Sequence, residues 1–231
     1  MLQALWFDFG GTLDTDGVHW SEKYWEAYCQ LQIAISKPHF EWAFVEADRV
    51  IAGEVPYTGM PFSHIIRRQL TLQFDLLSKV EPHFQQEQEK LEELISLSYI
   101  GVVKTMSQAR LILTRLAQKY LLVMISNFYG NLPVVCREFG INSLFSLLID
   151  SAEVGIRKPD QAIFQLALQH FDYPPQACAM IGDSYDKDIM PAKEIGCQTI
   201  WLKGKSWRTF PDTSLADHTI HSLSELPALL L

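Results

Sequence analysis

Short runs of apolar residues place the strongest constraint on how this chain can fold. They occupy residues 2–7, 121–125, 145–149, 177–181 and 199–202, and helical patterns separate the later ones. A strand that is apolar throughout is buried on both faces, because a half-exposed strand would alternate apolar and polar residues. Strands of this kind that alternate with helices are typical of a parallel sheet covered by helices. The pattern therefore predicts an α/β fold.

The stretch from Trp20 to Ser98 is helical throughout and interrupts this alternation. Its apolar residues recur at three- and four-residue spacing, and prolines and glycines divide it into four or five segments. With no strand between them, these helices are expected to form a separate helical subdomain. Beyond it, Ser107 is predicted to cap a new helix that runs to Lys119. A weaker strand is expected near residues 218–221.

The composition limits the class of partner. Of the 231 residues 48% are hydrophobic, which fits a globular chain, and the net charge of −8 disfavours nucleic acid or an anionic membrane surface as the main partner. The four cysteines are far apart, as is typical of buried thiols in a reducing compartment. No apolar run reaches membrane length, and the first residues lack the pattern of a secretory signal. We therefore expect a cytoplasmic protein with no membrane partner.

Polar residues of a particular kind follow the predicted strands. They are Asp8, Thr12, Ser126, Lys158, Asp183 and Asp188. The carboxyl ends of parallel strands meet at one edge of a sheet, so these side chains are expected to converge there. Carboxylate oxygens suit Mg²⁺, whereas hydroxyls and a lysine suit a phosphoryl group. An aspartate beside a bound phosphoryl group can act as a nucleophile.

Four short motifs carry a resemblance to a known family. They are Asp8–Leu13 for D-x-D-G-T-L, Ser126–Asn127 for a serine that ends a strand, Gly155–Pro159 for G-x-x-K-P, and Gly182–Asp188 for G-D-S-x-x-x-D. With these motifs in this order, the chain resembles the haloacid dehalogenase-like hydrolase superfamily. The resemblance implies a Rossmann-like core over residues 1–16 and 98–231, with an inserted helical cap over residues 17–97.

The resemblance also implies a role for each motif residue. Asp8 would be the nucleophile, and Mg²⁺ would be held by Asp8, the main-chain carbonyl of Gly10, Asp183 and Asp188. The phosphoryl oxygens would be held by Thr12, Ser126 and Lys158, with Asn127 meeting the substrate or the loop above the site. The metal and Lys158 would neutralise the charge on the transferred group. Asp14 and Asp16 are interpreted as turn residues.

Gly10 departs from the family pattern. Phosphatases of the family carry there a second aspartate, which is the general acid and base, and such help is commonly worth ~10²–10⁴ in rate. Three outcomes stay open: a substrate with a good leaving group, a replacement from the cap, or binding without efficient turnover. His19, His64 and Tyr129 are the candidate replacements.

The predicted function is Mg²⁺-dependent hydrolysis of a small phosphomonoester, a phosphorylated metabolite, through an aspartyl-phosphate at Asp8. Two alternatives remain. A metal-independent 2-haloacid dehalogenase also lacks the second aspartate and carries Ser-Asn in the second motif, but it usually has a tyrosine at the position of Gly10, and Asp183 is typical of the metal-dependent members. A non-catalytic phosphate- or partner-binding protein is the other alternative.

Overall fold

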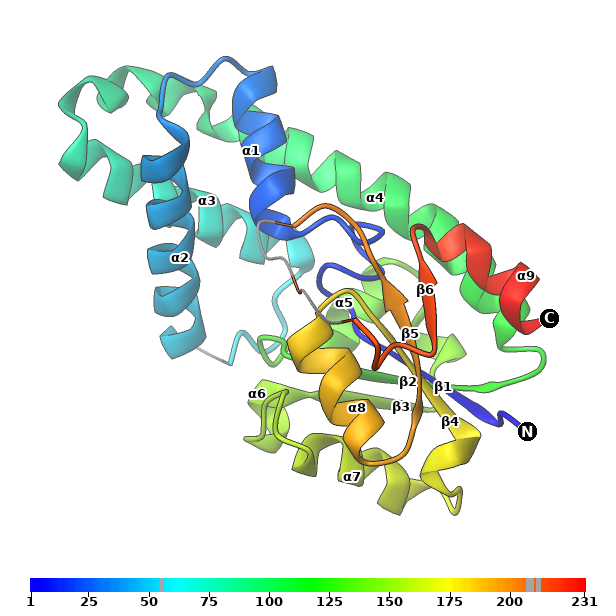
Figure 1. Ribbon diagram of the computed structural model, residues 1–231. Helices are drawn as coiled ribbons and strands as arrows, with labels where there is room; N and C mark the ends of the chain where they lie inside the picture. Colours follow the sequence, from blue (N-terminus) through cyan, green and yellow to red (C-terminus); the bar gives the residue numbers. More distant parts are fainter. Residues whose placement is uncertain (55, 207–209, 211–212) are drawn as a thin grey trace.

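Six parallel strands form one sheet in the part of the chain that the computed structural model describes, which is residues 1–54, 56–206, 210 and 213–231 (Figure 1). The order across the sheet is β3-β2-β1-β4-β5-β6. The strands are β1 (Ala4–Phe7), β2 (Leu121–Ser126), β3 (Leu147–Asp150), β4 (Cys178–Gly182), β5 (Gln198–Leu202) and β6 (His218–Ile220). The predicted α/β fold with a parallel, Rossmann-like sheet is confirmed.

The central strand β1 is apolar because both of its faces are covered. Leu5 and Phe7 pack into one hydrophobic cluster, whereas Ala4 and Trp6 pack into a second cluster on the opposite face. Helices α4 (Leu91–Leu116), α5 (Leu132–Glu138) and α9 (Leu226–Leu230) contribute to the first cluster. Helices α7 (Ala162–His170) and α8 (Met190–Glu194) contribute to the second. Burial on both sides explains why the strand lacks alternating polar residues.

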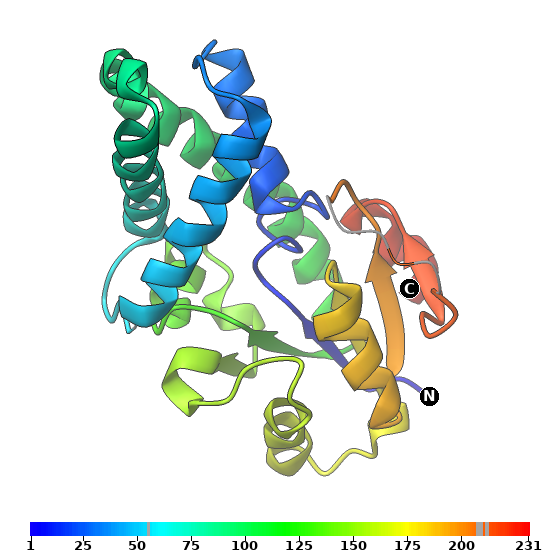
Figure 2. The ribbon, with the colours of Figure 1, turned by 60° about the vertical axis from the view of Figure 1, so that its left-hand side comes forward.

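Three helices follow β1 and lie beyond the carboxyl ends of the strands (Figures 1 and 2). They are α1 (Trp20–Gln30), α2 (Lys37–Glu54) and α3 (Phe62–Val80), and a 3₁₀ segment (Pro82–Lys90) connects α3 to α4. Their apolar faces meet in an aromatic core in which Tyr28 contacts Phe40 and Phe74. None of the helices in the described residues is both long and apolar enough to cross a membrane.

The prediction that a helix begins at Ser107 is wrong. Ser107 lies inside α4, which runs without a break from Leu91 to Leu116. Its hydroxyl donates to the carbonyl oxygen of Val103 at 2.8 Å, so the side chain is satisfied within the helix and caps nothing. The predicted division between residues 97 and 98 falls within α4, because one helix belongs to both the helical region and the cover of the sheet. The two-unit division stays a prediction.

In the second half of the core, a π-helical turn (Tyr185–Ile189) follows β4 and leads into α8. The π turn brings Asp188 back toward the end of β4, where its carboxylate accepts from the backbone N–H of Ser184 at 3.1 Å. The remaining short helix, α6 (Ser151–Val154), follows β3 directly.

Candidate active site

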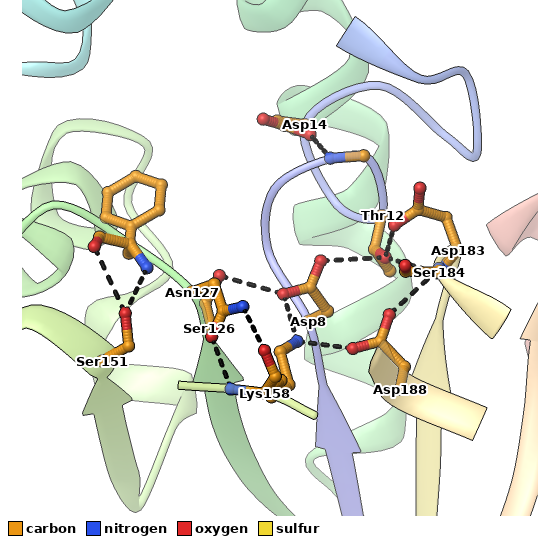
Figure 3. A network of polar contacts seen from close by, with 12 residues as sticks. Asp8, Thr12, Asp14, Ser126, Asn127, Ser151, Lys158, Asp183, Ser184 and Asp188 are labelled. Carbon is orange, nitrogen blue, oxygen red and sulfur yellow. Dashed lines mark hydrogen bonds and ion pairs between the residues drawn. The ribbon is translucent and has the colours of Figure 1, made fainter. Parts of the chain in front are cut away.

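Asp8 lies one residue beyond β1, between the ends of β2 and β4. Its backbone N–H donates to the carbonyl oxygen of Ile181 at 3.0 Å, which fixes the residue against β4. Its side chain is 8% exposed and receives the hydroxyl of Ser126 at 2.9 Å and the ammonium of Lys158 at 2.7 Å, both on Oδ1 (Figure 3). The hydroxyl of Thr12 lies 3.4 Å from Oδ2. The strand order therefore brings these four predicted residues together.

Lys158 connects two of the carboxylates. Its Nζ lies 2.7 Å from Asp8 Oδ1 and 2.5 Å from Asp188 Oδ1, and all three side chains are buried. Burial lowers the pKa of Lys158, but the nearby charges of Asp188 and Asp8 outweigh it and leave the pKa raised above its usual value. The lysine is therefore a fixed positive charge at neutral pH.

Asn127 holds the backbone of that lysine. Its Nδ2 donates to the carbonyl oxygen of Lys158 at 2.9 Å, and its Oδ1 accepts from the Lys158 N–H at 2.8 Å. The amide thus fastens the 155–159 loop to the end of β2 (Figure 3). This contact fits the expected position against the loop, and contact with the substrate stays a prediction.

Asp183 and Asp188 complete an acidic cluster with Asp8. Each of the three offers a carboxylate oxygen, and these oxygens all lie within 4.8 Å of one another. Burial, followed by the charges of Asp8 and Asp188, raises the pKa of Asp183 well above its usual value. Burial also raises the pKa of Asp188 to about 6, although Lys158 opposes the shift. Three carboxylates against one ammonium leave a formal charge of −2, which a divalent cation would offset.

Two glycines, Gly11 and Gly182, have no side chain and so make room for the carboxylates of the acidic cluster. A Cβ at Gly182 would lie 2.3 Å from Asp188 Oδ2, and a Cβ at Gly11 would lie 2.5 Å from Asp183 Oδ2. Gly11 also has a φ of +91°, which other residues rarely adopt. At Gly10, by contrast, a Cβ would meet nothing within 4 Å. The first two glycines are required by the carboxylates, whereas Gly10 borders open space.

Asp14 has a larger structural role than the turn position predicted from the sequence. Its Oδ1 accepts from the N–H of Gly11 at 2.7 Å, and its Oδ2 accepts from Nε1 of Trp20 at 2.8 Å. Burial raises its pKa to about 7, against the lowering effect of these hydrogen bonds. The carboxylate therefore connects the glycine turn of the core to α1. Only the tertiary contact with Trp20 reveals this role.

Two of the cavities that open at the acidic edge of the sheet border Gly10. One of about 120 Å³, here called the strand-edge cavity, is bordered by Asp8, Gly10, Lys158, Asp183 and His19. A neighbouring one of about 200 Å³, the cap cavity, lies between the core and α1–α3, and its border includes Gly10, His19, Trp20 and Tyr129. Of the three candidate replacements for the missing acid, His19 borders both cavities and Tyr129 the second. His64 borders neither, and its ring lies against Tyr57.

Comparison with known proteins places these features in a family. Residues 2–196, a span that contains all four motifs, match the haloacid dehalogenase-like hydrolase family. The chain belongs to the haloacid dehalogenase-like hydrolases. The resemblance read from the motifs is therefore confirmed, and in this chain Asp8 and Asp183 follow the adjacent strands β1 and β4.

Individual relatives match this chain over shorter segments. Haloacid dehalogenase-like hydrolase domain-containing protein 3 of Danio rerio is 32% identical over 107 residues, which is 46% of this chain and 44% of that protein. Glyceraldehyde 3-phosphate phosphatase of Methanocaldococcus jannaschii is 40% identical over 90 residues, which is 38% of this chain and 39% of that protein. The matches thus span less than half of these curated relatives.

A solved structure supports the fold over the whole length of this chain. The 2-haloacid dehalogenase of Pseudomonas syringae pv. tomato superposes with a TM-score of 0.54 over 100% of this chain and 98% of that one. The two sequences are 23% identical, so the likeness concerns the fold alone.

Proposed function

We propose that this chain hydrolyses a small phosphomonoester, with Asp8 as the nucleophile and Mg²⁺ as its metal. The observation that carries the proposal is the meeting of Asp8, Lys158, Asp183 and Asp188 at one edge of the sheet. The matched relative named glyceraldehyde 3-phosphate phosphatase supports phosphate esters as the substrate class.

The residues around Asp8 would perform the first half of the reaction. A carboxylate oxygen of Asp8 attacks phosphorus, the bond to the alcohol oxygen breaks, and that oxygen leaves with the bonding electron pair. The hydroxyls of Ser126 and Thr12 and the ammonium of Lys158 already contact Asp8, so they are placed to donate to the oxygens of a phosphoryl group seated on it. Water then hydrolyses the aspartyl-phosphate and frees Asp8.

The acidic cluster fits a hard divalent cation. Its three carboxylates are close enough to share one ion, and Lys158 offsets only part of their charge. Mg²⁺ would be held by Asp8, Asp183 and Asp188, together with the carbonyl of Gly10. When bound, the ion neutralises charge that develops on the transferred group.

The same charge argues against carbon–halogen hydrolysis without a metal. A 2-haloacid is an anion, and three carboxylates, two of them buried, with a single ammonium would repel it. The phosphomonoester is also an anion, but the proposed divalent cation would offset the formal charge of −2 and remove this repulsion. Dependence on a divalent ion therefore separates the two activities.

The direct test is release of phosphate from p-nitrophenyl phosphate with and without Mg²⁺. We expect activity that EDTA abolishes and that Asp8→Asn lowers by at least ~10³-fold, because the nucleophile is lost. Asp75→Asn is the matched control, since Asp75 is exposed on α3 and far in sequence from the motifs. Phosphate release that survives EDTA or Asp8→Asn would contradict the proposal, and halide release from 2-chloropropionate in EDTA would favour the dehalogenase.

A further inference from the structure

The cap cavity is placed to receive the alcohol part of a phosphomonoester. It shares Gly10, Asn127 and Lys187 on its border with the strand-edge cavity, so a group attached to a phosphoryl group on Asp8 would extend into it. The volume of the cap cavity is about 200 Å³. Because a water molecule takes up about 30 Å³ in the liquid, this space holds roughly six or seven water-sized groups, which fits an alcohol of about three or four carbons.

Tyr24 on α1 presents an unpartnered hydroxyl to the cap cavity. The residue is 4% exposed, and its ring lies against Trp20 and Phe44 at centroid distances of 4.9 and 6.2 Å. Its hydroxyl forms no hydrogen bond with any residue that the structure describes, yet neighbouring atoms do not seal it off. Burial, followed by the charges of Tyr129 and Asp14, raises the pKa of Tyr24 well above its usual value, so the hydroxyl keeps its proton. A buried hydroxyl without a partner is unfavourable, and a ligand that supplies one is favoured.

Two further neutral polar groups border the same cavity. Gln69 on α3 is 5% exposed, and its Nε2 donates to the carbonyl oxygen of Phe44 at 3.2 Å. The Oε1 of Gln69 and the hydroxyl of Tyr129 have no hydrogen-bond partner in the described part of the chain. Burial raises the pKa of Tyr129 as well, so it remains a neutral phenol. A phenol both donates and accepts, and an amide oxygen accepts, which matches the hydroxyl groups of an alcohol.

The charged groups on the border of the cap cavity are exposed or already satisfied. Asp48, Arg157 and Lys187 are exposed, and the two cations already act on the carboxylate of Asp48 as opposite charges. Asp14 is buried, but both of its oxygens accept hydrogen bonds from N–H groups. The buried end of the cavity therefore offers hydroxyl and amide groups rather than a counter-charge. An ion buried without a counter-charge is costly, so an uncharged alcohol fits better.

Resting on the phosphatase function proposed above, we infer that the substrate is the phosphate ester of a small uncharged polyol, which Tyr24 and Gln69 select through its hydroxyl groups. Hydroxyl groups of the polyol donate to Oε1 of Gln69 and accept from the hydroxyl of Tyr24. Its hydrocarbon face packs against the buried rings and methyl groups of Phe62 and Ile66, which border the same cavity. Tyr24 and Gln69 set the specificity and take no part in breaking the phosphorus–oxygen bond.

The experiment compares phosphate esters of alcohols that share a chain of three carbons. The alcohols are propanol, glycerol, 3-hydroxypropionate and 3-aminopropanol, which differ in carrying no further polar group, hydroxyls, a carboxylate or an ammonium. Each ester is measured as a competitive inhibitor of p-nitrophenyl phosphate hydrolysis, so slow release of an alkoxide does not hide binding. We expect the inhibition constant of the glycerol ester to lie at least ~10-fold below that of the propyl ester, because only glycerol supplies the missing hydrogen bonds. Both charged esters should bind more weakly than the glycerol ester.

Tyr24→Phe removes the unpartnered hydroxyl and keeps the ring. The inhibition constant of the glycerol ester should rise ~5–10-fold and that of the propyl ester by much less. The melting temperature should not fall, because the substitution breaks no hydrogen bond among the described residues. Tyr28→Phe is the matched control: Tyr28 lies one turn further along α1, borders neither cavity, and donates to Oε1 of Gln73 at 3.1 Å. It should lower the melting temperature and leave both inhibition constants unchanged.

The possible results separate this inference from the phosphatase function. No inhibition by any of the esters, equal inhibition by the glycerol and propyl esters, or tighter binding of a charged ester would overturn the polyol substrate alone. Equal changes of both inhibition constants in Tyr24→Phe would likewise overturn the role of the Tyr24 hydroxyl. If p-nitrophenyl phosphate is not hydrolysed in the presence of Mg²⁺, the phosphatase function is overturned as well.

Discussion

Replacement of Lys158 by methionine tests the charge balance of the site. Lys158 Nζ lies 2.7 Å from Asp8 and 2.5 Å from Asp188, and these side chains are at most 8% exposed. Removing one partner of a buried ion pair typically costs ~3–5 kcal/mol, because the other charge stays buried without compensation. A change of 1 kcal/mol shifts the melting temperature of a chain of this size by ~2–4 °C. Lys158→Met should therefore lower Tm by ~6–20 °C in EDTA at neutral pH.

The pH dependence of this loss gives a second, independent check. Asp188 has a folded pKa of about 6, above its ordinary 3.8, because burial outweighs the opposing effect of Lys158. A carboxyl whose pKa is raised in the folded state contributes stability at low pH, and that contribution is lost as the pH rises through the folded pKa. Without Lys158 the pKa of Asp188 should rise further. The difference in Tm between the two proteins should therefore shrink from pH 7 to pH 5.

Differential scanning calorimetry in EDTA measures both effects. Lys187→Met is the matched control, because Lys187 is exposed on the π turn beside the site and should change the unfolding free energy by less than ~0.5 kcal/mol. Equal Tm values for Lys158→Met and the unsubstituted chain at pH 7, or a difference that persists unchanged at pH 5, would refute the picture of a buried and undercompensated carboxylate cluster.

Two other changes follow from the same contacts. Gly182→Ala would place a Cβ 2.3 Å from Asp188 Oδ2, so we expect the Asp188 carboxylate to be displaced. The affinity for Mg²⁺, measured by calorimetric titration, should then fall at least ~10-fold. An unchanged affinity would contradict the crowding of Asp188 by the new Cβ. Trp20→Phe removes a donor from buried Asp14, and a hydrogen bond to a charged group is worth ~1.5–3 kcal/mol. The indole lowers the pKa of Asp14, which is about 7, because it stabilises the charged carboxylate. The loss of unfolding free energy, measured by urea denaturation, should therefore be larger at pH 8 than at pH 6. The reverse order would contradict a hydrogen bond from Trp20 to charged Asp14.

The sheet could be predicted because its strands have a strong local signature. Continuous apolar runs such as Leu121–Ile125 require burial on both faces, and parallel packing then brings the residues that follow them to one edge. The convergence of Asp8 with Ser126 and Asp183 follows from that packing alone. The motif order, rather than any single residue, made the family recognisable.

The features that could not be predicted depend on contacts between residues that no local sequence pattern encodes. Ser107 has the residue type of a helix cap, yet a hydroxyl inside a helix can instead donate to the carbonyl four residues earlier, as it does to Val103. Asp14 is polar and lies in a turn, and its burial is made tolerable by the N–H of Gly11 together with the indole of Trp20 from α1, a contact that no local pattern reveals. The π turn that carries Asp188 likewise reflects its contacts with Lys158 and Ser184 rather than helix propensity.

The most direct measurement is the location of the phosphoryl group during turnover. The chain would be mixed with Mg²⁺ and p-nitrophenyl phosphate, quenched in acid within the first turnover, digested, and sequenced by tandem mass spectrometry. The account predicts one added phosphoryl group on Asp8 that is absent when EDTA is present from the start. Turnover with Asp8 unmodified, or with the phosphoryl group on another residue, would contradict it.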